Sequence, residues 1–396
     1  MTLVLLDHAA GAPESDALAP VTTARPLAEV RVGALLVRER WAMALDTHVT
    51  GVIATTRLTG FEEPGSAPVL ADDVLLDAGT IVALSAFAPM LVPADRVGDS
   101  WTHAAETVAA ILPRATTVRD IRAQGIAAGS TPVPLNGYML RQPWDLIGYL
   151  PAMLSADAQT LAMREPAPHD LPADVRVLGD HAVRIAESAV IEPFVVLDAT
   201  QGAIIVGEHA VVRSFSRLSG PFVLGAHSTW MAGSGSTVSI GEYCKVSGEV
   251  STTIICGHAN KGHDGFLGHS YLGRWTNLGA GTVTSNLKNT YGHVSFAGAD
   301  SGLQFLGSIL GDHAKTGILT RLTTGSCIGA GANVISDDVV PSVVPAFTWG
   351  SHGERYERAR FLQTAAMVMA RRKVVLTEAM RDCLATVYDV MTGSRR

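Results

Sequence analysis

A six-residue repeat runs through the second half of the chain: a branched aliphatic residue, a small residue and four variable positions. Each unit suits one short strand and a tight corner, because the aliphatic side chain points inward and the small residue turns without a Cβ clash. The repeat therefore predicts a β-helix, whose ends need capping and whose flat faces favour self-association. Its units are Ile185-Ala186, Val206-Gly207, Leu224-Gly225, Ile240-Gly241, Leu267-Gly268, Leu272-Gly273, Leu278-Gly279, Leu306-Gly307, Leu310-Gly311 and Ile328-Gly329.

The length of 396 residues exceeds the usual size of one domain, so we expect two folded units. Hydrophobic residues make up 47% and charged residues 17%, which fits large cores and excludes a disordered protein. We predict an α/β domain over residues 1–160, a Pro-rich, charged linker over 161–175, the β-helix over 176–345 and a helical segment over 346–396.

Local patterns add detail to this plan. The first domain shows strand patterns at Thr2–Leu6, Val49–Thr55 and Thr80–Leu84, and helix patterns at Pro26–Leu45 and Ser100–Leu112. The last segment, Tyr356–Val390, has apolar residues at helical spacing, which predicts a long helix that caps the last coil or a neighbouring subunit.

Composition also limits the classes of binding partner and the cellular location that we expect. The net charge of −7 argues against a nucleic-acid or anionic-membrane surface. The first residues lack a basic region before a short apolar run, and no apolar stretch reaches the roughly 20 residues of a membrane helix, so a cytoplasmic location is expected. The cysteines lack metal-site or disulfide spacing and are predicted to be buried: Cys244, Cys256, Cys327 and Cys383.

The richest segment for chemistry is Lys261–Asn289. His263 lies between glycines, where a bulge from the coil would expose it as a general base. Glu249 precedes it by a little under one coil, so stacking would bring a carboxylate beside the imidazole and orient it. The turn at Asn277–Thr282 offers backbone N–H groups to an oxyanion, and Asn286 adds an amide donor. This constellation indicates acyl transfer.

The stretch GHDGFLGHSYLGRWTNLGAGTVTSN resembles the acetyltransferase half of the bifunctional N-acetylglucosamine-1-phosphate uridyltransferase/glucosamine-1-phosphate acetyltransferase family, whose pattern is a His, a short loop, NIGAGT and an Asn. The resemblance is specific over residues 240–340. It implies a left-handed parallel β-helix, a homotrimer with its pocket between subunits, and acetyl-CoA or another acyl-CoA as donor.

Residue by residue, the resemblance implies that His263 is the catalytic base, Glu249 its partner, Asn286 a donor and Ala280 a backbone donor. The family's substrate-binding Arg and Lys positions hold Gly233 and Ser251, and its Tyr is Phe266, so the acceptor pocket has changed. Contacts with the acyl donor are predicted at Gly281, Thr282, Lys261, Lys288 and Lys315. Contacts with the acceptor are predicted at Arg25, Arg31, Asn136, Phe266 and Asn277.

The segment ARPLAEVRVG at 24–33 is similar to a variant subgroup of the same family, in which RPxxExRxG stands near the start of a nucleotidyltransferase-like domain. The ordinary signature is a GxGTRM-type loop and a Pro-Lys pair, which hold the triphosphate. This chain has HAAGAPES at 8–15 and no lysine before Lys245. Either nearby arginines replace the lost cation, or Arg25 and Glu29 only cap and pair on the first helix. The replacement arginines would be Arg25, Arg31, Arg38 and Arg40.

The same subgroup has its hinge into the second domain where this chain has Asn136-Gly137 and Trp144-Asp145. No metal ligand is assigned, since the candidates Asp7, Asp72 and Asp73 are of a kind common on surfaces, and Mg²⁺ is expected only if the first domain is active.

Three functions remain open from the sequence. The first is a CoA-dependent N-acyltransferase for an amino sugar, amino-sugar phosphate or sugar nucleotide, with His263 as base. The second is a sugar-1-phosphate nucleotidyltransferase whose β-helix mainly assembles the trimer. The third is a non-catalytic relative that binds a nucleotide or CoA.

Overall fold

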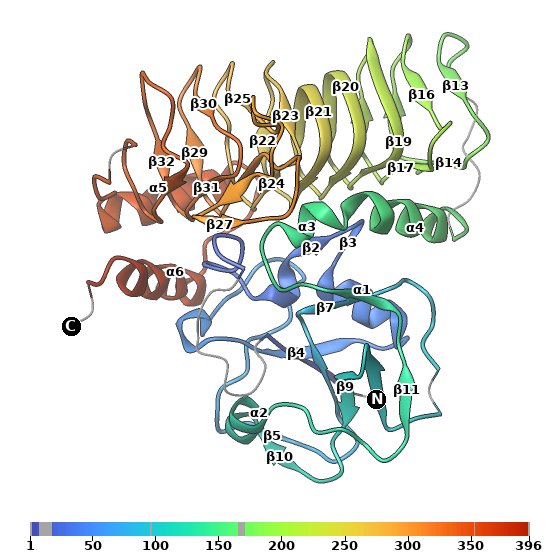
Figure 1. Cartoon of the computed structure of the whole chain (residues 1–396), viewed down its shortest axis with the longest axis vertical. Helices are drawn as coiled ribbons and strands as arrows, with labels where there is room; N and C mark the ends of the chain where they lie inside the picture. Colours follow the sequence, from blue (N-terminus) through green and yellow to red (C-terminus); the bar gives the residue numbers. More distant parts are fainter. Residues whose placement is uncertain (1, 8–17, 96, 165–170, 352, 395–396) are drawn as a thin grey trace.

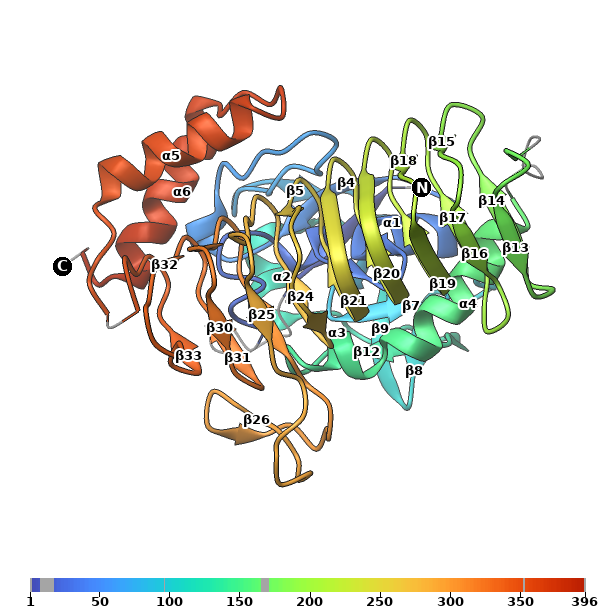
Figure 2. The ribbon, with the colours of Figure 1, turned by 90° about the horizontal axis from the view of Figure 1, so that it is seen from above.

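The computed structural model describes residues 2–7, 18–95, 97–164, 171–351 and 353–394. It contains an N-terminal α/β domain, a parallel β-helix and C-terminal helices, as predicted (Figure 1). The long side of the β-helix lies across the N-terminal domain, so the two units share a broad interface (Figures 1 and 2).

The N-terminal domain is built on a six-stranded mixed sheet. Its strands, in spatial order, are β11 (Pro132–Pro134), β8 (Ser100–His103), β9 (Glu106–Ile111), β6 (Ile81–Leu84), β1 (Leu3–Leu6) and β4 (Val49–Ile53). The small pairs are β2 (Arg31–Val32) with β3 (Leu35–Leu36), β5 (Leu75–Leu76) with β10 (Thr116–Thr117), and β7 (Phe87–Pro89) with β12 (Gly137–Met139). Helices α1 (Val37–Ala44) and α2 (Val118–Gln124) and the 3₁₀ turns η1 (Leu27–Glu29) and η2 (Thr56–Leu58) complete it.

Two helix predictions in this domain are wrong in whole or in part. Residues 100–112 form the antiparallel hairpin β8–β9, because Ala104 and Ala105 turn at positive φ and the apolar residues suit a buried strand as well as a helix. Within 26–45 only α1 is α-helical, since Gly33 at φ +59° turns the chain between β2 and β3. The three predicted strands are confirmed as β1, β4 and β6.

The strands of the β-helix extend from Arg176 to Val344. Its strands up to residue 284 are β13 (Arg176–Leu178), β14 (Val183–Ile185), β15 (Val190–Ile191), β16 (Val196–Asp198), β17 (Ile204–Val206), β18 (Val211–Val212), β19 (Ser216–Leu224), β20 (Thr229–Ile240), β21 (Lys245–Ile255), β22 (Asn260–Lys261), β23 (Leu267–Gly268), β24 (Tyr271–Leu272) and β25 (Val283–Thr284). Its strands from residue 308 onward are β28 (Ser308–Leu310), β29 (Lys315–Thr316), β30 (Arg321–Leu322), β31 (Ser326–Ile328), β32 (Asn333–Val334) and β33 (Val343–Val344). The repeat aliphatics line the interior as one buried column.

The coils present three faces, which differ in what covers them. The domain face contains β14, β17, β24, β28, β31 and β33 and the last residues of β19, β20 and β21. The open face contains β13, β16, β23, β25, β30 and the stretches 216–219, 233–236 and 248–251. The groove face contains β15, β18, β22, β29, β32 and the starts of β20 and β21.

Helix α4 (Leu150–Ala162) lies along the domain face, preceded by the short helix α3 (Asp145–Gly148) (Figure 1). It buries Leu150, Met153, Leu154 and Ala158 at the three- and four-residue spacing of a helix stripe. Outward side chains of the domain face, including Ile254 and Ile309, join the same hydrophobic cluster as the N-terminal sheet. The interface is therefore a continuous core and not a loose contact between two modules.

One coil contains a large insertion. Val283 and Arg321 pair on adjacent coils although they are 38 positions apart, as are Tyr271 and Ile309, whereas paired residues on the other coils are 15 to 21 positions apart. The extra chain includes the hairpin β26 (Ser295–Phe296) and β27 (Ala299–Asp300). Phe296 packs edge-on against Trp144, with ring centroids 5.8 Å apart, so the hairpin touches the segment that joins the domains.

The single helix predicted over 356–390 is two helices, α5 (Arg358–Ala370) and α6 (Glu378–Met391). The chain turns between them, and Lys373 has φ +60° there. Phe361 on α5 packs against Phe347 of the last coil, with centroids 4.9 Å apart, which confirms the capping of the β-helix. Helix α6 packs on η2 of the N-terminal domain, so the tail also ties the two units together.

A network of buried charges holds the interface. Glu63 of the N-terminal domain accepts hydrogen bonds from Arg25, from Arg274 at 3.1 Å and from Trp275 Nε1 at 2.7 Å. Arg25 Nε also donates to Asp312 Oδ2 at 2.7 Å. These cations hold the pKa of Glu63 far below its usual range despite burial, whereas burial raises the pKa of Asp312 to about 6. Glu63 thus remains ionised and is matched by two arginines.

Cys244, Cys256 and Cys383 are buried and Cys327 is partly buried, all as free thiols. Within the described residues, the helices are all too short or too polar to pass through a bilayer.

We expect Glu63→Gln to lower the free energy of unfolding by about 3–5 kcal/mol, because it removes the buried carboxylate that two buried guanidinium groups share and leaves Arg25 with Asp312 alone and Arg274 with Glu242 alone. Glu106→Gln is the matched control: Glu106 pairs with Arg141 at 2.5 Å, but both side chains are more than half exposed, so its loss should cost less than about 1 kcal/mol. Urea unfolding of both variants measures the difference. An equal loss of unfolding free energy in both variants would contradict a stabilising role for the buried charge network.

Candidate active site

His263 lies at the corner that joins β22 on the groove face to β23 on the open face. Its imidazole is exposed and forms no hydrogen bond or ion pair with another described residue. The corner is fixed from inside by Lys261, whose Nζ donates to the carbonyl oxygens of Ser247 at 2.9 Å and of His263 at 2.5 Å. Lys261 is 2% exposed, so the structure gives this predicted donor-binding residue a role in holding the His263 corner.

Glu249 reaches the open face from the preceding coil. The pairing of Val250 with Leu267 places Glu249 beside Phe266, and stacked strands lie about 4.8 Å apart. Phe266 is three residues from His263 along the chain, so Glu249 lies at the side of the corner loop. Its carboxylate is exposed and has no hydrogen-bond partner among the described residues. The imidazole of His263 and the carboxylate of Glu249 are thus both accessible from solvent.

Phe266 and Asn286 meet over Gly268 on the open face. A Cβ on Gly268 would lie 2.3 Å from Phe266 Cζ and 2.8 Å from Asn286 Nδ2, so the missing side chain makes room for both groups. Ser251 pairs with Gly268, and Gly233 pairs with Gly248. The substituted family positions therefore form an uncharged floor of small residues beside Glu249 and Phe266.

His269 is a residue of this site that sequence reasoning missed. Its Nδ1 lies 2.8 Å from Asn286 Nδ2, and its ring stacks on Phe305 of the insertion, with centroids 5.2 Å apart. Burial lowers the pKa of His269, so the ring is neutral near pH 7. Because an amide nitrogen only donates, Nδ1 accepts and the ring hydrogen is on Nε2. The sequence offered one signal for this contact: His269 and Asn286 are 17 residues apart, which is about one coil.

The turn after Leu278 leaves the backbone N–H groups of Ala280 and Gly281 without a partner among the described residues. The Ala280 carbonyl accepts from Leu319 N at 2.7 Å. Gly281 turns the chain at φ +72°. Thr282 was predicted to contact the acyl donor, but its hydroxyl lies inside the coil, 2.8 Å from Thr316 Oγ1, and the residue is 2% exposed.

Two further predicted residues, Asn277 and Lys315, line a groove of about 390 Å³ between the groove face and α5. Asn277 Oδ1 accepts from Asn260 Nδ2 at 2.8 Å, and Lys315 Nζ donates to the His313 carbonyl at 2.9 Å. Burial lowers the pKa of Lys315 to about 8. Lys288 lies instead on the insertion, partly buried.

The arginines of residues 25–40 in the N-terminal domain form hydrogen bonds and ion pairs within the protein. Arg25 and Arg31 are 1% and 7% exposed; Arg25 enters the Glu63 network and Arg31 Nε donates to Ser239 Oγ at 2.8 Å across the interface. Arg40 pairs with Asp157 at 2.5 Å, with both side chains fully buried, and Arg38 pairs with Glu29 at 2.9 Å. These guanidinium groups are thus engaged inside the protein. Their positions conflict with the predicted substrate contacts of Arg25 and Arg31 and with the idea that nearby arginines replace the lost lysine.

The remaining N-terminal candidates are separate. Asn136 is exposed, and its backbone carbonyl accepts from Met90 N at 3.0 Å. Asp7 accepts from the N–H groups of Leu27 and Ala28, and Asp72 pairs with Arg122 at 3.1 Å. No group of metal-ligating side chains gathers within the ranges that the structure describes. The phosphate-loop position, 8–15, lies outside those ranges.

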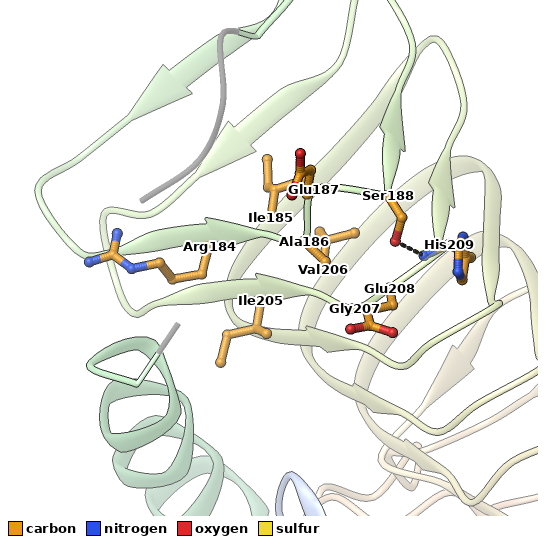
Figure 3. A pocket seen from close by; sticks show the side chains of 10 residues that line it. All are labelled: Arg184, Ile185, Ala186, Glu187, Ser188, Ile205, Val206, Gly207, Glu208 and His209. Atoms are coloured by element: carbon orange, nitrogen blue, oxygen red, sulfur yellow. Dashed lines mark hydrogen bonds between the residues drawn. The ribbon is translucent and has the colours of Figure 1, made fainter. Parts of the chain in front are cut away.

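A second cavity of about 540 Å³ lies on the first coils, lined by segments 184–188 and 205–209 (Figure 3). Ser188 Oγ accepts from the His209 N–H at 3.0 Å at its edge. None of the predicted site residues lines this cavity, and those in the β-helix lie several coils further along.

Comparison with known proteins finds matches to parts of the chain. Residues 11–165 match the family model described as sugar nucleotidyl transferase. Curated relatives include the bifunctional protein GlmU of Jannaschia sp. (strain CCS1), 30% identical over 41% of this chain and 33% of that protein. The GlmU of Polaromonas naphthalenivorans (strain CJ2) is 30% identical over 41% of this chain and 28% of that protein.

The chain thus spans about a third of the length of the curated relatives it matches. The resemblance to this bifunctional family, expected from the sequence, is confirmed. A solved structure of an Arabidopsis UDP-N-acetylglucosamine acyltransferase is 12% identical, with 57% of this chain and 96% of that chain covered and a TM-score of 0.20.

The crowding over Gly268 yields a stability prediction. Gly268→Ala should lower the free energy of unfolding by about 1–3 kcal/mol, because the new methyl group meets the Phe266 ring and the Asn286 amide. Gly292→Ala is the control: its nearest neighbour would be Thr290 Oγ1 at 4.0 Å, so the change should be below about 0.5 kcal/mol. Chemical unfolding compares the two, and a neutral Gly268→Ala would show that Phe266 and Asn286 move apart without cost.

Proposed function

We propose that the chain transfers an acyl group from acetyl-CoA or another acyl-CoA to the amine of an amino sugar, amino-sugar phosphate or sugar nucleotide. The observation that carries this proposal is the exposed, unpaired imidazole of His263 in a corner loop that the unpaired carboxylate of Glu249 flanks from the neighbouring coil. A base and an orienting carboxylate at a solvent-facing corner suit proton removal from an attacking amine.

The steps balance with the residues at this corner. His263 takes the proton from the acceptor amine as its nitrogen attacks the thioester carbonyl. A C–N bond forms, the C–S bond breaks, and the departing thiolate receives the proton. The Ala280 N–H stabilises the oxyanion between these events. Asn286 donates one amide hydrogen to His269 and has a second for the substrate.

The small-residue floor shapes the acceptor site. Gly233 and Ser251 contribute no charge beside Glu249 and Phe266, so the acceptor's anionic groups, where it has any, are held elsewhere. We further propose that the pocket is completed by a neighbouring subunit of a homotrimer. Exposed apolar side chains at the corners support self-association: Phe215 is 78%, Ile318 72% and Leu319 70% exposed.

A second candidate is nucleotidyl transfer to a sugar 1-phosphate, with Mg²⁺, in the N-terminal domain. The family match over residues 11–165 supports it. The internal pairing of the nearby arginines and the absence of lysine before Lys245 weigh against it. Exchange of labelled pyrophosphate into a nucleotide sugar, with Mg²⁺ present, tests this activity independently of CoA.

We expect His263→Ala to reduce acyl transfer by about 10²–10⁴-fold, because the attacking amine loses its general base. Thiol release from acyl-CoA, measured over a panel of amino sugars and their phosphates and nucleotide derivatives, gives the rate. His181→Ala removes another exposed histidine, on the first coil, and should leave the rate unchanged. Full activity in His263→Ala would remove the central residue of the proposal.

A further inference from the structure

The groove between the groove face and α5 has an unusual charge distribution. Four cationic side chains line it: Lys245, Lys315, Arg371 and Arg372. No acidic residue lines it, and none of the four cations forms an ion pair with a described carboxylate. The chain as a whole has a net charge of −7, so this is a local concentration of positive charge against the overall balance.

The cations come from two parts of the fold, the coils of the β-helix and the end of α5, which lie together at the groove. Lys245 begins β21 and Lys315 begins β29, whereas Arg371 and Arg372 follow directly after α5 (Figure 1). Desolvation lowers the pKa of both Lys315 and Arg372, which means that burial of these charges is not offset by the protein itself. Uncompensated, partly buried cations are costly unless an anion neutralises them.

The groove is long and offers neutral donors between its charges. Lys245, Asn260, Asn277 and Lys315 occupy successive coils of the groove face, so about 14 Å separates the first from the last at 4.8 Å per coil. The amides of Asn260 and Asn277 bond to each other and have further hydrogen-bonding capacity. Such a row suits an elongated anion with several oxygens better than a single compact one.

The groove also leads to the candidate active site. Asn260 and Asn277 each precede a predicted catalytic residue, His263 and Ala280, by three residues, which spans at most about 11 Å of extended chain. A ligand anchored in the groove by its phosphates therefore has its remaining part within reach of that corner.

We propose that this groove binds a diphosphate group, held by Lys245, Lys315, Arg371 and Arg372, in a nucleotide or a nucleotide-linked molecule. The site is defined by its own charges and volume; only its use in positioning a reactant at His263 rests on the proposed function. Both nucleotide sugars and CoA carry a diphosphate, and binding measurements separate these sources.

Isothermal titration with pyrophosphate as the minimal probe tests the site, with UDP and CoA as parallel ligands. We expect pyrophosphate to bind and its affinity to fall at least about tenfold in Arg371→Gln/Arg372→Gln, because two charge-assisted contacts are removed. Arg360→Gln removes an equal kind of charge from the exposed side of α5, 78% exposed, and should leave binding unchanged. Tighter binding of UDP or of CoA than of pyrophosphate identifies the source.

Lys245→Met provides a second variant on the rigid β-helix, in case the changes at the end of α5 disturb the helix, and should weaken pyrophosphate binding similarly. Absence of pyrophosphate binding to the wild-type chain, or equal binding by Arg371→Gln/Arg372→Gln and Arg360→Gln, would overturn the proposal. His263→Ala should retain pyrophosphate binding whatever its effect on turnover, so failure of the groove and failure of the acyl-transfer proposal give different results.

Discussion

The register between stacked coils determines where every candidate residue lies. Parallel backbone pairing places residues 15 to 21 positions apart directly beside each other, and the inward aliphatic column prevents a slip, because a shift by one residue would turn that column outward. Glu249 reaches Phe266, and Asn260 reaches Asn277, only because this register holds. The site is therefore a property of the stack and not of any single loop.

The arginines of the N-terminal domain show how one residue type can serve structure where function was expected. Arg25 and Arg40 are almost completely buried, and each is neutralised by a carboxylate from another element. A guanidinium group committed to such a pair cannot turn to a phosphate without leaving a buried carboxylate unpaired. This domain and the β-helix share one hydrophobic cluster, so these ion pairs stabilise the whole arrangement.

The fold was largely predictable, since the six-residue repeat needs only local geometry. The hairpin β8–β9 was not, because a short apolar run suits helix and strand alike until its partner strand is known. Arg25 could not be placed, since its partners Glu63 and Asp312 are 38 and 287 residues away. The place of His269 in the site could not be predicted either, because its ring stacks on Phe305, which the insertion brings against it. The exposure of His263 agrees with the predicted bulge; its role stays a prediction.

Helix α5 explains part of the positive groove but not all of it. Cations near a helix C-terminus are stabilised by the helix dipole, which accounts for Arg371 and Arg372 following Ala370. The dipole stabilises charges only within its last turn, and Lys245 and Lys315 belong to coils of the β-helix. The coils of the β-helix and the end of α5 thus both place positive charge without a counter-charge in the same groove. A bound anion satisfies both at once, whereas capping of α5 alone would require neither lysine.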